Sequence, residues 1–340
     1  MSQQPPLPAQ MRAVVIHEYC DGFRHLKSEQ RPVPHPVGDQ VLVRVAAAPI
    51  NPSDLLFVQG RYAFRKELPV VPGFEGAGTV VAVGEDLDPD AYIGRRVAAF
   101  AADGDGSWAE YMLVTASTCI PVNDQTDDEQ AAMRLINPLT AWAILDMARQ
   151  RGQRAVVQSA AAGSLGQMIY RLGQRWGIEV INVVRREEQR QTLQALGAKH
   201  IFDSSEPSFL MDLRERCAAL EAVMAFDSVA GALTGQLLRA LPPGGEVVVQ
   251  GGLSGDPIEI EVNQLVYLNK RVSGFWLSTW IRDPERVLVA YRDTQGDLRD
   301  VFTTKVHKRH SLQHPVGALS EYAVSMSDGK ILFVPDQPSN

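Results

Sequence analysis

Residues 154–186 read RAVVQSAAAGSLGQMIYRLGQRWGIEVINVVRR, and this stretch predicts strand, tight turn, helix and strand in succession. The segment 155–158 is short, apolar and β-branched, as expected of a buried parallel strand. Apolar residues recur at helical spacing over 164–176, and Gly177 is placed to end that helix. A second apolar strand follows at 179–184. The stretch therefore predicts one βαβ unit of a doubly wound α/β domain.

The turn between this first strand and its helix has the spacing of a dinucleotide fingerprint, with alanine at the first glycine position. We expect Gly163 to let the backbone approach a pyrophosphate and Gly166 to let helix and strand pack closely. The helix N-terminus offers N–H groups and a positive dipole end to an anion. Small residues also serve packing alone, but the complete strand–helix–strand frame favours a nucleotide site. The expected contacts in this turn are Ala161, Gly163, Ser164, Leu165 and Gly166.

Two arginines, Arg185 and Arg186, end the second strand, where an NAD site usually has Asp or Glu for the ribose 2′-hydroxyl. The negative charge and acceptor oxygens of a 2′-phosphate suit a guanidinium fork. The pair therefore favours NADPH as the cofactor. The alternative is two solvated arginines at a helix start, partly neutralised by Glu187 and Glu188.

Composition excludes several classes of protein. The chain of 340 residues is long enough for two domains, and its net charge of −7 argues against nucleic acid as a partner. Three cysteines in no disulfide or metal pattern indicate free thiols in a reducing compartment. The polar, proline-rich N-terminus is unlike a secretory signal, and no apolar run approaches the ~18 residues of a membrane span. We expect a cytoplasmic protein with no membrane partner.

The chain before residue 122 has short β-rich runs separated by proline and glycine, at 12–16, 40–47, 78–83, 96–100 and 111–114. Their spacing predicts a partly closed antiparallel barrel or sandwich. A polar break at 124–128 precedes one helix near residue 129 and another over 139–149.

Strands and helices alternate from residue 155 to 275, with strands expected at 155–158, 179–184, 200–202, 222–226, 246–250 and 271–275. From residue 281 onward the sequence shows no regular strand–helix alternation, and it predicts a helix near 312–327 and a closing strand at 331–334. The tail is therefore expected to rejoin the first domain. This predicts one domain from 1–131 and 279–340, and a cofactor domain over 132–278.

Several local motifs resemble the medium-chain dehydrogenase/reductase superfamily over nearly the whole chain: NPSD at 51–54, PGFEGAG at 72–78, GSWAEY at 106–111 and AAAGSLG at 160–166. The resemblance implies a GroES-like β-rich catalytic domain beside the doubly wound Rossmann domain. Zinc alcohol dehydrogenases of that superfamily hold catalytic metal with Cys, His and Cys. Asn51, Phe74 and Asn137 stand at those positions here, and these side chains are unsuited to a zinc site. We expect no metal.

Within the zinc-free branch the chain is similar to quinone oxidoreductases and, more closely, to mitochondrial-type trans-2-enoyl thioester reductases. Motifs that carry this second similarity are QGRY at 59–62, INPLTA at 136–141, INVVR at 181–185 and GFWLSTW at 274–280. The chain departs from those reductases at the N-terminus, where no mitochondrial presequence is evident, and between Asp293 and Phe302, where it is shorter. The acyl substrate stays open.

The resemblance places Tyr62 where enoyl reductases have a catalytic tyrosine. A tyrosine hydroxyl is protonated at neutral pH, so it can either stabilise an enolate by a hydrogen bond or deliver a proton. The alternative is a surface aromatic among Arg61, Arg65 and Lys66. Asn51 either binds the nicotinamide ribose or the substrate, or only shapes the turn before Pro52. Asp54 is expected to fix structure.

Further cofactor contacts are expected at Thr140, Gly251, Gly252, Phe275 and Trp276. Three alternatives stay open: Thr140 caps the start of its helix, the two glycines only form a tight turn, and Phe275 only packs in the core. Trp276 and Trp280 are expected to line an acyl channel or to cover a dimer interface. The segment HKRHSLQH at 307–314 clusters His307, His310 and His314, and it predicts a solvated connector, with a metal site as the alternative. The basic run at 305–309 has a second alternative, a surface that attracts coenzyme A.

These observations predict an NADPH-dependent, metal-free reductase of α,β-unsaturated thioesters or carbonyls, acting on a small-molecule substrate as a homodimer. The alternative within the same class is an NADPH:quinone oxidoreductase. The alternative of another class is a non-catalytic NADPH-binding protein, like the crystallins recruited from this branch.

Overall fold

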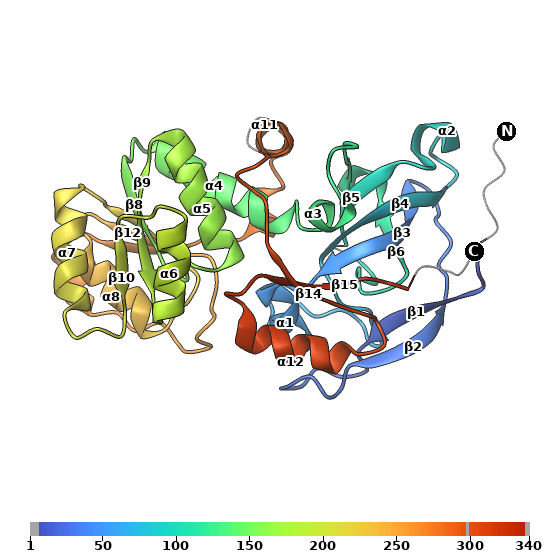
Figure 1. Ribbon diagram of the computed structural model, residues 1–340, viewed down its shortest axis with the longest axis horizontal. Helices are drawn as coiled ribbons and strands as arrows, with labels where there is room; N and C mark the ends of the chain where they lie inside the picture. The colour runs from blue at the N-terminus through green and yellow to red at the C-terminus, as the bar shows by residue number, and fades with distance from the viewer. Residues whose placement is uncertain (1–6, 102, 297–298, 337–340) are drawn as a thin grey trace. The chain divides into compact units, whose positions relative to one another are not determined.

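The computed structural model describes residues 7–101, 103–296 and 299–336, and divides the chain into two compact units (Figure 1). Unit 1 comprises Met1–Ile136 with Thr304–Asn340, and unit 2 comprises Asn137–Thr303. The chain therefore passes between the units after Ile136 and after Thr303, whereas the sequence analysis placed these boundaries after residues 131 and 278.

Unit 2 is built on a six-stranded parallel sheet in the order β10-β9-β8-β11-β12-β13. Its strands are β8 Ala155–Gln158, β9 Glu179–Val184, β10 Ile201–Asp203, β11 Met224–Asp227, β12 Glu246–Val249 and β13 Arg271–Gly274. Strand order reverses between β8 and β11, the point where such sheets bind ligands at their carboxyl ends. The predicted doubly wound fold is confirmed.

Helices cover both faces of this sheet. They are α4 Ile136–Gln150, α5 Ser164–Trp176, α6 Glu187–Ala195, α7 Phe209–Ala219 and α8 Ala232–Ala240. Leu213 of α7 and Leu237 of α8 share an apolar cluster with Val157 of β8. Helix α5 lies on the opposite face, because a Cβ at Gly173 would come within 2.5 Å of Val180 Cγ2, and side chains alternate along a strand.

A helix that the sequence did not predict, α11 Pro284–Gln295, explains the displaced boundary. The Asp283 carboxylate caps it by accepting the Arg286 N–H, and Pro284 occupies its first turn. The indole N–H of Trp142 in α4 donates to Asp293 at 2.8 Å. The Trp280 ring, in the short helix α10 Leu277–Trp280, lies 6.0 Å from that of Trp142. These contacts keep the segment in unit 2.

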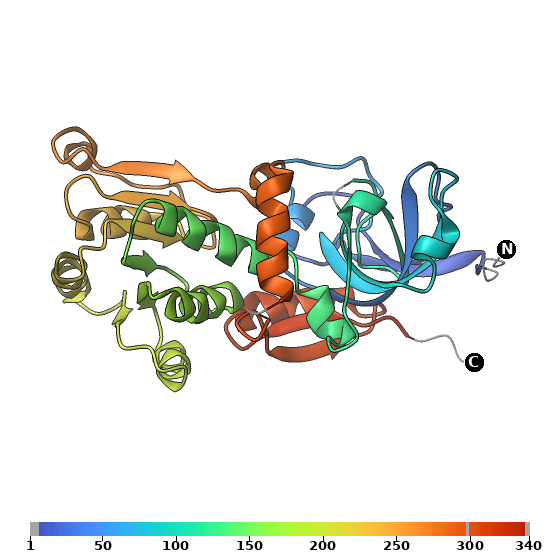
Figure 2. The same cartoon turned by 90° about the horizontal axis from the view of Figure 1, so that it is seen from above.

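The unit 2 sheet has two edge strands, β10 and β13, and β13 follows the short helix α9 Val262–Val266 (Figure 2). Strand β13 pairs with β12 through Arg271↔Glu246 to Gly274↔Val249.

Unit 1 is β-rich, and its main sheet runs β14-β15-β3-β4-β5-β7, with β6 also paired to β3. The strands are β3 Gln40–Pro49, β4 Glu75–Val83, β5 Arg96–Phe100, β6 Tyr111–Thr115, β7 Cys119–Pro121, β14 Val306–His310 and β15 Lys330–Phe333; β1 Gln10–Val15 pairs separately with β2 Lys27–Pro32. All pairs are antiparallel except β14 with β15. Strand β15 pairs with β3, so the tail does rejoin the first domain.

Short helices complete unit 1: α1 Pro52–Val58, α2 Pro89–Tyr92, α3 Asp128–Ala132 and α12 Pro315–Ser325, with the 3-10 turn Ala116–Thr118. Its core joins β1, β3, β4 and α12 through residues such as Val14, Leu42, Val80 and Leu319. Among the helices described, none has the length and apolar character that a bilayer crossing needs.

The segment 306–310 forms strand β14 and is not the expected connector, although most of its side chains are exposed, as expected. Much of its charge is paired. The Lys308 ammonium lies 2.8 Å from the Glu321 carboxylate, and the His310 ring nitrogen contacts the same group at 3.0 Å. The Arg309 guanidinium pairs with Glu129. These pairs let a polar sequence occupy an edge strand.

Candidate functional site

The glycine turn after β8 has the form expected at an anion-binding helix start. Helix α5 begins at Ser164, with Gly163 in extended conformation before it. A Cβ at Gly166 would lie 2.4 Å from the carbonyl oxygen of Ala161 in the turn after β8, so only glycine allows the start of α5 to lie this close to that turn. The left-handed residue of the turn is Ala160, at φ 49°. The first N–H groups of α5 have no partner within the helix and suit a phosphate.

The carboxyl ends of the parallel strands bring most of the expected cofactor residues to one edge of unit 2. The turn at 161–166 follows β8, Arg185 follows β9, Gly251 and Gly252 follow β12, and Phe275 and Trp276 follow β13. Thr140 does not follow a strand; it is a buried residue of α4.

The two arginines after β9 are exposed, and Arg186 is the residue that precedes helix α6. The Arg185 backbone N–H donates to Gln189 Oε1 at 3.0 Å. The carboxylate of Glu187 lies 3.5 Å from Arg190. Within the described residues neither Arg185 nor Arg186 forms an ion pair, so both guanidinium groups are available to an anion.

Gln250, which follows β12, is a candidate that the sequence reasoning missed. Its side-chain N–H donates to Ser228 Oγ at 3.0 Å, while its Oε1 is buried without a hydrogen-bond partner among the described residues. A buried amide oxygen of this kind calls for a donor. The neighbouring Gly252 faces open space, where an added Cβ would meet no atom within 4 Å. The edge therefore has the polar group and the room that a nucleotide cofactor needs.

A buried hydrogen-bond network holds this edge where the strand order reverses. Ser159 Oγ, after β8, donates to Asp227 Oδ1 at 2.6 Å, at the end of β11. The same carboxylate accepts the Val229 N–H at 2.8 Å and the Thr234 hydroxyl at 2.6 Å. Fully satisfied networks of this kind rigidify a strand end.

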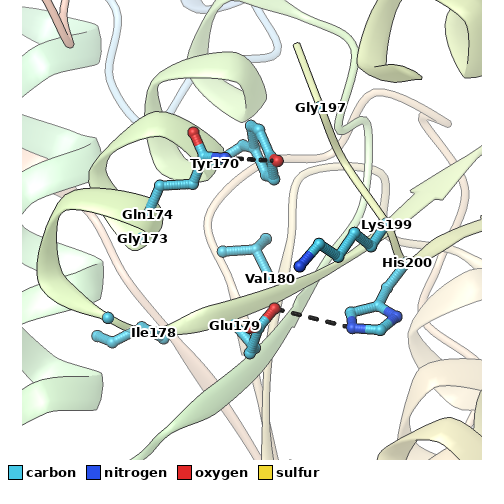
Figure 3. A pocket seen from close by; sticks show the side chains of 10 residues that line it. Tyr170, Gly173, Gln174, Ile178, Glu179, Val180, Gly197, Lys199 and His200 are labelled. Atoms are coloured by element: carbon cyan, nitrogen blue, oxygen red, sulfur yellow. Dashed lines mark hydrogen bonds and ion pairs between the residues drawn. The ribbon is translucent and has the colours of Figure 1, made fainter. Parts of the chain in front are cut away.

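A cavity of about 310 Å³ lies near the amino ends of the strands of the same sheet, at the end of α5 and the start of β9 (Figure 3). Tyr170, Glu179, Lys199 and His200 line it, with His200 Nε2 3.7 Å from Glu179. Burial lowers the pKa of His200. Because the cavity is at the amino end of β9, it is separate from the candidate cofactor edge.

Tyr62 is half-buried in an aromatic cluster of unit 1, and is not an exposed loop aromatic. Its ring centroid lies 5.0 Å from that of Phe74 and 5.1 Å from that of Phe64. Its backbone N–H donates to the Leu56 carbonyl of α1 at 3.1 Å. The nearby Lys66 ammonium donates to the Gly104 carbonyl at 2.8 Å, and burial lowers its pKa. The catalytic role of Tyr62 stays a prediction.

Asn51 is buried, with 1% of its surface exposed, and precedes helix α1. Its backbone N–H donates to Asp54 Oδ2 at 2.7 Å, and its side-chain N–H donates to Glu75 Oε1 at 2.9 Å. The Lys330 ammonium donates to its Oδ1. These contacts shape the turn before Pro52, one of the two expected roles. A contact with cofactor or substrate stays a prediction.

Asp54, Glu75, Lys330 and Tyr322 form a buried polar cluster around Asn51. Asp54 also accepts the Phe74 N–H at 3.1 Å, so its expected structural role is confirmed. Burial raises the pKa of Asp54 to about 7, and it also raises the pKa of Glu75 and that of Tyr322. Burial lowers the pKa of Lys330 to about 8, although the carboxylates of Glu75 and Asp54 oppose the shift.

The three positions that align with zinc ligands do not fit a zinc ion. Phe74 has no donor atom, and both ends of the Asn51 amide are bonded to Glu75 and Lys330. Asn137 offers an amide in place of the thiolate that zinc prefers. In the described part of the chain, no group of three or more His, Cys, Asp or Glu side chains is arranged to hold a metal.

The tryptophans of the 274–280 motif differ in their surroundings. Trp280 packs on Trp142, whose ring lies 5.9 Å from that of Trp176, so it belongs to an aromatic stack within unit 2. Trp276 is 40% exposed. Of the two, Trp276 has more surface to offer a ligand or a partner.

The chain belongs to the medium-chain dehydrogenase/reductase superfamily, in the family that includes the mitochondrial enoyl-[acyl-carrier-protein] reductases, and it is an oxidoreductase. The alcohol dehydrogenase GroES-like domain model matches residues 38–124, and the zinc-binding dehydrogenase model matches residues 164–290. The mitochondrial enoyl-[acyl-carrier-protein] reductase of Xenopus tropicalis is 31% identical over 335 residues, which covers 95% of this chain and 93% of that protein.

Solved structures are also similar over nearly the full length. A structure described as a putative NADPH:quinone reductase of Mesorhizobium loti is 32% identical, with a TM-score of 0.88, covering 97% of this chain and 100% of that one. A mycobacterial protein complexed with NADPH is 25% identical, with a TM-score of 0.80, covering 96% of this chain and 100% of that one. The expected superfamily and fold are confirmed.

Proposed function

We propose that this protein reduces an activated C=C bond, in a 2-enoyl thioester or a related α,β-unsaturated carbonyl compound, with NADPH and without a metal. The observation that carries the proposal is the carboxyl edge of the unit 2 sheet, which joins an anion-binding helix start, the exposed Arg185 and the unpartnered Gln250 Oε1. Similarity to an enoyl reductase over 93% of that protein's length supports the substrate class.

NADPH, when bound, supplies the hydride for the β-carbon of the substrate. The protein supplies position and charge. In our proposal the N-terminus of α5 with Gly163 binds the pyrophosphate, and Arg185 with Arg186 binds the 2′-phosphate. Thr140, Gly251, Gly252, Phe275 and Trp276 complete the cofactor contacts, with Gln250 Oε1 accepting a cofactor N–H or O–H group. Trp276 and Trp280 line the acyl channel.

Tyr62 is the proposed catalytic residue. Its hydroxyl donates a hydrogen bond to the oxygen on which enolate charge develops, and so stabilises the transition state. Protonation of the α-carbon then completes the reduction. Phe64 and Phe74, packed against the Tyr62 ring, hold the ring in place.

Quinone reduction is a second candidate, favoured by the 32% identity to the putative quinone reductase. A non-catalytic NADPH-binding protein is the alternative of another class. NADPH consumption measured with crotonyl-CoA, longer enoyl-CoAs, a simple enone and a quinone distinguishes the three. We expect the enoyl thioesters to have the highest kcat/KM; faster turnover of the quinone would favour the second candidate. NADPH binding without turnover of any acceptor would favour the non-catalytic class.

We predict that zinc is dispensable, despite the description of one matching family model. Purified protein should contain no stoichiometric zinc, and a chelator should leave turnover unchanged, because Asn51 and Phe74 do not supply zinc ligands. Elemental analysis before and after chelation checks this. One equivalent of zinc, with turnover lost on its removal, would contradict the prediction.

The homodimer that the sequence predicted also stays a proposal, supported by the edge of the unit 2 sheet. Strand β13 lies at that edge, and the nearby Val262, Val266 and Tyr267 are 70%, 63% and 83% exposed. An apolar patch beside an edge strand favours pairing with another chain.

Tyr267→Asp combined with Val266→Lys should convert a particle of two chains into one of a single chain, because charge is costly in a buried apolar interface. Light scattering after size exclusion measures the mass. Met211→Asp is the matched control, since Met211 is 68% exposed on α7, away from this edge. A monomeric parent protein, or a double variant that keeps the parent's dimeric mass, would contradict the proposal.

A cytoplasmic location stays a prediction. The named relative from Xenopus tropicalis is mitochondrial. Fractionation of cells that produce the tagged full chain compares the two locations directly.

A further inference from the structure

Lys330, the first residue of β15, is a buried lysine that the proposed chemistry does not use directly. It is 2% exposed. Its ammonium donates to three acceptors: the Ile50 carbonyl at 3.2 Å, the Tyr322 hydroxyl at 3.3 Å and the side-chain oxygen of Asn51. An ammonium has three N–H donors, so the three acceptors use all of them.

The bond to Lys330 sets the orientation of the Asn51 amide. With its oxygen held by the ammonium, the amide presents its NH₂ group to Glu75 Oε1 at 2.9 Å. The other carboxylate oxygen, Glu75 Oε2, accepts the N–H groups of Leu135 and Ile136 at 3.2 and 3.1 Å. Leu135 precedes α4 and Ile136 is its first residue, one turn before Thr140. A continuous polar chain thus runs from Lys330 to the start of α4.

A second branch of the same cluster reaches Tyr62. The Asn51 backbone N–H donates to Asp54 Oδ2, and Asp54 Oδ1 accepts the Phe74 N–H. The Phe74 ring packs on Tyr62 at 5.0 Å. The polar groups that bind the Phe74 N–H and those that bind the N–H groups of Leu135 and Ile136 therefore meet at one residue, Asn51.

We propose that Lys330 is a positioning residue of the reductase: its ammonium fixes the Asn51 amide, and through it the start of α4 and the support of Tyr62. The proposal rests on the proposed function for its effect on turnover. Lys330 itself touches neither cofactor nor substrate in this role. A buried cation is costly, and the two carboxylates and three acceptors around it offset that cost.

The charge state of Lys330 decides how many of these bonds exist. Loss of one proton leaves two N–H donors for three acceptors. Burial lowers the pKa of Lys330 to about 8, so the ammonium form predominates below that pH and is lost as the pH rises through it. The titratable groups that face it are Asp54 of α1, Glu75 of β4 and Tyr322 of α12. We therefore expect kcat to fall above about pH 8.

Two substitutions test the role of the charge. Lys330→Met keeps the length of the side chain and removes every donor, so kcat should fall about tenfold with little change in the Kd of NADPH. Lys330→Arg keeps a charge that does not titrate below pH 12, so it should restore much of kcat and remove the alkaline limb. Lys308→Met is the matched control: this exposed lysine of unit 1 pairs with Glu321, and its loss should leave kcat and the pH profile unchanged.

The Asn51 side-chain amide gives a readout that does not depend on turnover. In ¹H–¹⁵N spectra its NH₂ hydrogens should exchange slowly with solvent in the parent and in Lys308→Met, and at least about tenfold faster in Lys330→Met. Equal exchange in all three proteins would overturn the positioning role. A Lys330→Met variant with the kcat of the parent would also overturn it, whether or not its melting temperature is lower. A parent that binds NADPH but reduces no acceptor would refute the proposed function instead, while the amide exchange would still decide the role of Lys330.

Discussion

Replacing Tyr62 by phenylalanine should lower kcat for an enoyl thioester by about 10²- to 10⁴-fold, the usual contribution of a positioned acid. The substitution removes one hydroxyl and leaves a ring able to pack on Phe64 and Phe74. The loss should therefore fall on the transition state, and the Kd of NADPH should hardly change. Stopped-flow and steady-state rates with crotonyl-CoA measure the effect.

A matched control is available in the same aromatic cluster. The Tyr19 hydroxyl accepts the Lys66 N–H at 2.8 Å and donates to the Lys66 carbonyl at 2.9 Å, so Tyr19→Phe removes a hydroxyl with a structural role. It should leave turnover within about twofold while lowering stability by ~1 kcal/mol. Quinone reduction should suffer less in Tyr62→Phe, because the negative charge of a reduced quinone is delocalised over an aromatic ring and depends less on one hydrogen-bond donor than the charge of an enolate does. If Tyr62→Phe reduces crotonyl-CoA as fast as the parent, Tyr62 is only a packing residue.

Replacing Arg185 by alanine should weaken NADPH binding about tenfold or more and leave NADH binding nearly unchanged. A charge-assisted hydrogen bond contributes roughly 1.5–3 kcal/mol, and 1.4 kcal/mol corresponds to a factor of ten. Removing Arg186 as well should bring the loss to about a hundredfold or more. Titration of tryptophan fluorescence with each cofactor gives both dissociation constants.

Arg190→Ala is the control for loss of a nearby positive charge. Arg190 lies in α6 and pairs with Glu206 at 2.7 Å, so its removal should affect both cofactors little. An equal loss of NADPH and NADH affinity in Arg185→Ala would mean that Arg185 supports the fold and does not bind a 2′-phosphate.

The sheet of unit 2 was predictable because its signals are local. The apolar run at 155–158, the helical spacing over 164–176 and the glycine at 177 lie within one short stretch, and the structure has these elements at the same bounds. Gly177 adopts φ 68°, the left-handed cap that its position indicated. Because the strands are parallel, Arg185 and Gly251 are then expected on the same side of the sheet, at the carboxyl ends of the strands.

Features that depend on distant partners were not predictable in this way. Helix α11 stays in unit 2 through Trp142 and Asp293, which are 151 positions apart. The sequence of β14 indicates a charged connector, because its pairing partners Glu321 and Glu129 lie elsewhere in the chain. The contact between Lys330 and Asn51 spans 279 positions, and no periodic pattern relates them. Tertiary packing overrides local propensity in each case.

Transfer of deuterium from NADPH to an enoyl thioester tests the proposed reaction most directly. Crotonyl-CoA would be reduced separately with NADPH deuterated at the 4R and at the 4S position, and the butyryl product analysed by mass spectrometry and NMR. One of the two cofactors should deliver one deuterium to the β-carbon, with the α-carbon proton taken from water. A product without deuterium at the β-carbon from either cofactor, or no reduced thioester at all, would contradict hydride transfer to an activated C=C bond.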